Sequence, residues 1–188
     1  DIVLLDSTET PINYNCFPVG RARENWRALN RAKVFFLTKC NWATPESLAF
    51  HRDSLKGQEV FEFDFGIKGF CDLRGNFLNQ LPKAKKILLV SAIAKPKAFY
   101  QMIQNFYSEA TVVGIDFPDH HRFSAADIKH IQQCFHGAFD CILVTEKDGV
   151  KLAQIKAAAD WPLWQVQLEL RPCFSVESLY AKIHSVLA

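Results

Sequence analysis

A regular alternation of short apolar runs with amphipathic segments, between residues 86 and 160, constrains the fold of this chain more than any other feature. The apolar runs are residues 86–93, 110–115 and 141–145. Each has the length and composition of a buried strand. Consecutive strand–helix units pack as a parallel sheet with right-handed crossovers. We therefore predict an α/β fold with a mostly parallel sheet flanked by helices.

The same patterns extend over the rest of the chain. Further strands are predicted at residues 2–5, 34–38, 59–65 and 163–170. Helices are predicted at residues 25–32, 44–55 and 124–136, and from residues 96, 147 and 176 onward. Two of the helix starts carry capping signals, because Thr44 precedes Pro45 and Ser124 stands three residues before Asp127.

Residues 59–77 separate two parts of the chain. Phenylalanines alternate with acidic residues at the start of this segment and three glycines follow, which is typical of a strand or hairpin. We predict residues 1–57 as the C-terminal part of one domain, 58–80 as a β-hairpin linker and 81–188 as a smaller α/β lobe. Residues 2–5 have the pattern of a buried strand with no initiator Met before them, so we expect the chain to begin inside a domain.

Composition excludes several classes of function. A net charge of +2 is too close to neutral to indicate a nucleic-acid partner. No apolar run reaches the length of about 18 residues that a bilayer span needs, so we expect no segment to cross a membrane. The six cysteines are scattered without a close pair, which favours free thiols in a reducing cytoplasm.

The pentapeptide F-P-D-H-H at residues 117–121 follows directly on a predicted strand and is the first candidate site. Ligands of α/β proteins bind beyond the carboxyl ends of parallel strands, so we expect Asp119 and His120 to lie near Lys95 and residues 146–148. An imidazole beside a carboxylate suits a general base or a base-orienting group. The alternative is that Asp119 caps the turn and the histidines are half-exposed loop residues.

Three other patterns are open to a functional and a structural interpretation. The start of the helix near residue 146, with Lys147 beside it, is either an anion site or a plain N-terminal cap. Arg23, Arg27 and Arg31 share one face of a predicted helix, where they either dock phosphate or form a solvated basic face. His120, His121, His130, Cys134 and His136 match no zinc spacing, so no metal site is predicted. A metal-dependent hydrolase that uses the first two of these histidines would require bound zinc.

Five segments resemble those of a known enzyme family. F-P-D-H-H at residues 117–121, followed by T-E-K-D-G-V-K at 145–151, resembles the C-terminal part of the tetraacyldisaccharide 4′-kinases, the lipid A 4′-kinases of Gram-negative bacteria. Residues 92–96 are similar to the family's G-I-A-x-P segment, residues 17–24 to its L-P-x-G-P-L-R-E segment, and residues 31–32 to the R-A that follows. These segments stand in the family's order and extend over most of the chain.

The resemblance implies a P-loop kinase that transfers the γ-phosphate of ATP, with Mg²⁺, to the 4′-hydroxyl of tetraacyldisaccharide 1-phosphate. The product is lipid IVA, and the reaction takes place at the cytoplasmic face of the inner membrane. The family's Walker A loop, catalytic Asp and D-D-G-x-Q segment precede the stretch that resembles this chain. We therefore expect ATP and Mg²⁺ to be bound mainly by residues upstream of Asp1, and the 188 residues alone to be inactive.

Particular residues take roles from the same resemblance. His120 matches the histidine that pairs with the catalytic Asp and helps it to accept the hydroxyl proton, with Asp119 in a supporting role. Glu24 matches an acidic residue near the nucleotide and metal, and Arg23 stands beside it. Lys147 is a candidate for binding nucleotide or substrate. The alternative to a kinase is a non-catalytic α/β binding or regulatory module derived from one.

Overall fold

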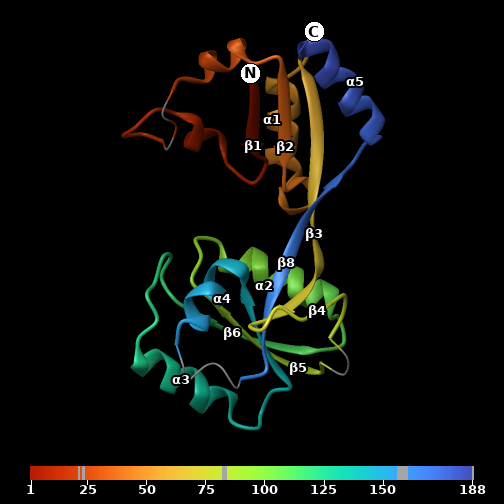
Figure 1. Ribbon diagram of the computed structural model, residues 1–188. Coiled ribbons are helices and arrows are strands. Elements are labelled where there is room, and N and C mark those ends of the chain that lie inside the picture. Colours follow the sequence, from red (N-terminus) through yellow and green to blue (C-terminus); the bar gives the residue numbers. More distant parts are fainter. Residues whose placement is uncertain (21, 23, 82–83, 156–160, 188) are drawn as a thin grey trace. The chain divides into compact units, whose positions relative to one another are not determined.

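The computed structural model describes residues 1–20, 22, 24–81, 84–155 and 161–187 (Figure 1). The chain folds into two compact units: unit 1 comprises Asp1–Gly66 with Glu169–Ala188, and unit 2 comprises Ile67–Leu168. Two strands, β3 (Glu59–Asp72) and β8 (Leu163–Pro172), each begin in one unit and end in the other. The predicted class, a mostly parallel α/β fold, is confirmed.

Unit 1 is built on three parallel strands. β1 (Ile2–Asp6) pairs with β2 (Val34–Thr38), which pairs with the first half of β3. Its helices are the α-helices α1 (Pro45–Ser54) and α5 (Val176–Leu187) and the 3-10 helices η1 (Pro11–Tyr14), η2 (Trp26–Arg31) and η3 (Cys40–Trp42). Thr44 caps α1 by accepting a hydrogen bond from Ser47 N at 3.2 Å, as its sequence predicts.

Alternating side chains of these strands give the unit 1 sheet two apolar faces. Leu5, Phe35 and Leu37 lie on one face, against Leu29 of η2 and Leu48 of α1. The opposite face carries an aromatic cluster of Phe36, Phe61 and Phe63, which Phe174 and Leu179 cover from the C-terminal segment. Helix α5 therefore packs on strands from the first half of the chain.

The segment predicted as a helix at residues 25–32 is the 3-10 helix η2. The side chain of Asn25 caps it by accepting a hydrogen bond from Arg27 N at 2.9 Å. A 3-10 helix has 3.0 residues per turn, so residues four apart do not share a face. Arg27 and Arg31 therefore do not lie on one face of this helix, so the predicted basic face is wrong for these two residues. Arg23, its third member, lies outside the described residues.

Unit 2 contains the predicted strand–helix units. Its strands β5 (Lys86–Ser91), β6 (Thr111–Asp116), β7 (Cys141–Thr145) and β8 are parallel, in the order β6-β5-β7-β8. Its helices are α2 (Pro96–Phe106), α3 (Ala125–Phe135) and α4 (Glu146–Ala153). β4 (Phe77–Leu78) forms a hairpin with the end of β3, and Gly75 takes the left-handed backbone that the turn requires, φ 91°.

Helices α3 and α4 cover one face of the unit 2 sheet (Figure 1). Their Ile128, Ile131 and Leu152 pack against Leu88 and Val144. The alternate residues of the same strands, including Ile87, Leu89 and Leu143, are also buried. Burial of both faces explains why these strands are continuous apolar runs in the sequence.

Two boundaries differ from the sequence predictions. Residues 59–65 were predicted as a strand, but β3 continues to Asp72 and provides both the link between the units and one arm of the hairpin. Residues 169–188 were predicted in one lobe with residues 81–168. In the structure they belong to compact unit 1, because α5 packs on the aromatic cluster described above. The division at residues 57 and 80 into a kinase domain, a linker and a lobe stays a prediction. Within the described residues, no helix combines the length and the apolar character that a membrane span requires.

Candidate functional site

The carboxyl ends of the unit 2 strands meet at one edge of the sheet. β5 ends at Ser91 and β6 at Asp116, and the Ser91 hydroxyl donates a hydrogen bond to Asp116 Oδ1 at 2.8 Å. The next residue, Phe117, donates from its backbone N to Ser91 O at 2.8 Å. The loop that carries F-P-D-H-H therefore leaves the sheet from a fixed point.

Asp148 joins a second strand end to this edge. Its side chain is fully buried, and Oδ2 accepts hydrogen bonds from Ala92 N at 2.9 Å and from the Thr145 hydroxyl at 2.8 Å. Lys151 donates to Oδ1 at 2.9 Å. The carboxylate thus connects the end of β5 to the start of α4. Both of its oxygens have hydrogen-bond partners, as buried polar groups usually do. Thr145 caps α4 by accepting a hydrogen bond from Asp148 N at 3.1 Å, and an anion site beside Lys147 stays a prediction.

Asp119 and His120 form the apex of the loop after β6. His120 has a left-handed backbone, φ 62°, and its N–H donates to Asp119 Oδ1 at 3.0 Å. Lys147, at the start of α4, donates to the same oxygen at 3.3 Å. The His120 ring is 78% exposed, and its Nε2 lies 3.8 Å from Asp119 Oδ2, which is too far for a hydrogen bond. The structure therefore brings together three of the predicted residues, Asp119, His120 and Lys147.

The charges around Asp119 keep it ionised. Desolvation works in the opposite direction, but the hydrogen bond from Lys147, the His120 imidazole and the ammonium charge together hold the pKa of Asp119 below its usual value. Lys147 is consequently engaged with a carboxylate of the loop. This contact indicates a role in shaping the loop, and the role of Lys147 in binding stays a prediction.

His121, the next residue, is turned toward the body of unit 2. Its ring stacks on Phe117 with centroids 4.8 Å apart and an interplanar angle of 19°. Its Nε2 lies 2.9 Å from Asp127 Oδ2, and the same oxygen accepts from the hydroxyl and the N–H of Ser124, each at 2.7 Å. Asp127 is the acidic member of the capping box of α3 that its sequence predicts.

This arrangement predicts an acid-dependent loss of stability. Hydrogen bonds from the Ser124 hydroxyl and N–H, and then from His121, lower the pKa of Asp127 from 3.8 to about 2. A carboxylate with a depressed pKa stabilises the fold above its unfolded pKa, and this contribution disappears as the pH falls through the folded pKa. We expect the urea midpoint to fall between about pH 4 and pH 2, and less so in Asp127→Asn. A wild-type midpoint with the same pH dependence as that of the variant would contradict this.

The remaining predicted residues are Lys95, Glu24 and Arg23. Lys95 directly precedes α2 and follows the end of β5. Glu24 belongs to unit 1, where its Oε2 accepts a hydrogen bond from Arg31 at 2.6 Å between two exposed side chains. Arg23 is outside the described residues. Glu24 and His120 therefore belong to different compact units, and a shared site stays a prediction.

The alternative metal site finds no support in the geometry. No group of three or more His, Cys, Asp or Glu side chains among the described residues is arranged to hold a metal ion. His130 and Cys134 have no third ligand of this kind among the described residues, and His121 is hydrogen-bonded to Asp127.

Sequence reasoning missed an ion pair at the carboxyl ends of the unit 1 strands. Asp6 ends β1, and its Oδ2 lies 2.5 Å from Nζ of Lys39, the residue after β2. Partial burial opposes the shift, but hydrogen bonds from Lys39 and Thr8 hold the pKa of Asp6 below its usual value. The sequence carries a signal for this ion pair, because a charged residue directly follows each of two predicted strands. Polar residues beyond the end of a predicted strand also marked His120 as a candidate.

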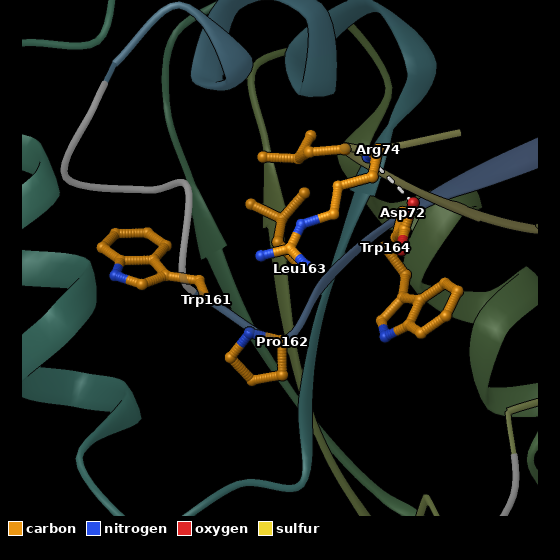
Figure 2. Close-up of a pocket in the computed structure, with 7 residues that line it drawn as sticks. Asp72, Arg74, Trp161, Pro162, Leu163 and Trp164 are labelled. Carbon is orange, nitrogen blue, oxygen red and sulfur yellow. Dashed lines mark hydrogen bonds between the residues drawn. The ribbon is translucent and has the colours of Figure 1, made fainter. Parts of the chain in front are cut away.

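A cavity of about 200 Å³ lies at the other edge of the unit 2 sheet (Figure 2). It adjoins the start of β8 and the hairpin turn, and Arg74 extends into the space between Trp161 and Trp164. Because β8 is parallel to β7, this cavity is at the opposite strand ends from His120. It includes none of the predicted site residues.

Comparison with known proteins gives a consistent result. A family model described as tetraacyldisaccharide-1-P 4′-kinase matches residues 1–188. The tetraacyldisaccharide 4′-kinase of Bdellovibrio bacteriovorus is 38% identical over 174 residues, which cover 90% of this chain and 51% of the relative. That of Flavobacterium johnsoniae is 35% identical over 147 residues, covering 74% and 41%. The chain thus spans about half the length of the curated relatives that it matches.

A solved structure shares the fold. It is described as the apo form of LpxK from Aquifex aeolicus in complex with ATP, and it aligns with a TM-score of 0.62 at 16% identity. The alignment covers 100% of this chain and 52% of that protein. At this identity the likeness concerns the fold alone.

Proposed function

The chain belongs to the tetraacyldisaccharide 4′-kinase family, and we propose that the protein that contains it transfers the γ-phosphate of ATP to the 4′-hydroxyl of tetraacyldisaccharide 1-phosphate, forming lipid IVA. The observation that carries this proposal is the family match over all 188 residues. The exposed His120 on a loop at the carboxyl strand ends agrees with it. Because the chain corresponds to half of its relatives, the activity belongs to the longer protein.

His120 and Asp119 form the part of the active site that this chain would supply. No described residue hydrogen-bonds to the His120 ring, so the ring is available to a carboxylate from outside unit 2. In the proposed mechanism His120 pairs with a catalytic Asp beyond this chain, orients it and helps it to accept the proton of the sugar hydroxyl. Asp119, held by Lys147, places a negative charge beside this imidazole, with His120 Nε2 3.8 Å from Asp119 Oδ2.

Phosphoryl transfer depends on positioning and on neutralising charge. We propose that ATP and Mg²⁺ are held mainly outside this chain, with Glu24, Arg23 and Lys147 contributing to the nucleotide or substrate site. Among the described residues, no group of three or more His, Cys, Asp or Glu side chains could hold a metal ion. Four acyl chains keep the acceptor in a membrane, so the protein would work peripherally, at the cytoplasmic face of the inner membrane.

A phosphorylation assay tests the proposal. The full-length protein, incubated with ATP, Mg²⁺ and tetraacyldisaccharide 1-phosphate, should form a product that carries one more phosphate, detected by mass spectrometry. Failure of the pure, folded full-length protein to bind ATP or to form this product would favour a non-catalytic module.

Residues 1–188 alone should not catalyse the reaction. They contain no G-x-x-x-x-G-K-[ST] sequence, and a kinase without its phosphate-binding loop cannot position the γ-phosphate. The same assay, with the 188-residue chain in place of the longer protein, should give product no faster than a reaction without protein. Measurable phosphorylation by the short chain would show that its own residues bind ATP productively.

A further inference from the structure

The backbone of His120 needs support from its neighbours. Its φ of 62° is a left-handed conformation, which is unfavourable for a residue with a Cβ. Such conformations persist where the surrounding structure fixes them. The His120 side chain is 78% exposed and no described residue hydrogen-bonds to its ring. The side chain of His120 therefore does not fix the conformation of its own backbone.

One side of the loop is held by contacts already described. Phe117 N donates to Ser91 O, and Lys147 donates to Asp119 Oδ1 at 3.3 Å. The Lys147 and Asp119 side chains are 44% and 39% exposed, so their contact is weakened by solvent. Directly after His120, the His121 N–H donates to Pro118 O at 3.0 Å and closes the turn, but this bond lies within the loop and does not attach it to the rest of unit 2.

His121 supplies the tether on the other side. It is the residue directly after His120, its side chain is only 27% exposed, and its ring is packed on Phe117 and edge-on to Phe123. A carboxylate only accepts hydrogen bonds, so His121 Nε2–H is the donor to Asp127 Oδ2 at 2.9 Å. Asp127 in turn is fixed by the two hydrogen bonds from Ser124 at the start of α3. The loop is thereby anchored to a helix terminus.

We propose that His121 is a positioning residue: through its hydrogen bond to Asp127 it holds the loop so that the adjacent His120 imidazole stands in its reactive orientation. The inference rests on the proposed function of His120. His121 itself does not meet the reacting groups, because its ring is turned into unit 2. A catalytic pair tolerates displacements of only about 1 Å before the rate falls substantially, so a loose loop would slow the chemical step.

The test measures kcat and KM in the full-length enzyme for two substitutions of His121. His121→Phe keeps an aromatic ring on Phe117 but removes the donor to Asp127. It should lower kcat about 10-fold or more while changing the KM for ATP less than about 2-fold. His121→Gln does not titrate but can still donate to Asp127, and it should restore kcat to within about 3-fold of wild type.

Three further variants complete the design. His130→Phe makes the same substitution at an exposed histidine of α3 and should leave kcat unchanged. His120→Ala reports whether the proposed function of His120 holds. If His121→Phe does not fold, His121→Met makes the same test with a flexible apolar side chain. Thermal unfolding of each protein shows that the assays compare folded enzymes.

The outcomes separate the two proposals. Wild-type kcat in His121→Phe, with a large loss in His120→Ala, would overturn the positioning role and leave the proposed function standing. A His121→Gln variant as slow as His121→Phe would also overturn it, because the hydrogen bond to Asp127 would not be what matters. Full activity in His120→Ala would remove the role of His120 and this inference with it.

Discussion

Replacing His120 with Ala in the full-length enzyme is expected to lower kcat by about 10² or more, because the catalytic carboxylate loses the group that orients it and assists proton acceptance. The side chain is 78% exposed and packs against no core residue. Stability should therefore change little, and the fall in rate should reflect chemistry. Steady-state kinetics with saturating ATP and lipid, together with thermal unfolding, measure both quantities.

A second variant separates the imidazole from its backbone. His120 has φ 62°, where Ala is strained, whereas Asn tolerates the left-handed region. His120→Asn should therefore keep the loop conformation and still lose activity as His120→Ala does. His136→Ala, at an exposed histidine after α3, is the control for loss of an imidazole and should retain wild-type kcat. Wild-type rates in both His120 variants would make His120 a loop residue without a catalytic role.

The largest expected effect on stability comes from Asp148. Asp148→Ala should lower the free energy of unfolding by about 3 kcal/mol, because Ala92 N–H loses a buried acceptor and Lys151 loses its partner. Asp148→Asn keeps the shape and one acceptor oxygen, so its cost should be smaller. Urea denaturation measures the free energies, and hydrogen exchange at the Ala92 amide reports the local effect.

Glu146→Ala is the matched control in the same helix. Glu146 is in the first turn of α4 and is exposed, so its removal should cost less than about 1 kcal/mol. Equal costs for the two substitutions would mean that Asp148 contributes only a helix-terminal charge. In that case the link between Ala92 and α4 would not stabilise unit 2.

Local patterns in the sequence predicted most of the elements. The strands at residues 34–38 and 141–145 were predicted with the bounds that β2 and β7 have, and the helix starts at Pro45, Pro96 and Ala125 follow their proline and capping signals. These features depend on residues within one turn or one strand of each other. The exceptions were the 3-10 character of η2 and the length of β3.

The candidate site was predicted in part for the same reason. Polar residues directly after predicted strands marked Asp119, His120 and Lys147, and the rule for parallel sheets brought them to one edge before the structure placed them there. The rule says nothing of side-chain direction. It did not distinguish His120, which faces solvent, from His121, which is turned onto Phe117 and Asp127.

The sequence by itself determined the α/β class, the order of the elements and the loop at which the candidate site lies, since each depends on local periodicity and on short motifs. Only the tertiary structure decided that α5 packs on the first half of the chain and that Asp148 bonds to Ala92 from 56 residues away. Such pairings depend on where distant segments come together. No local pattern records which partner a side chain will find there.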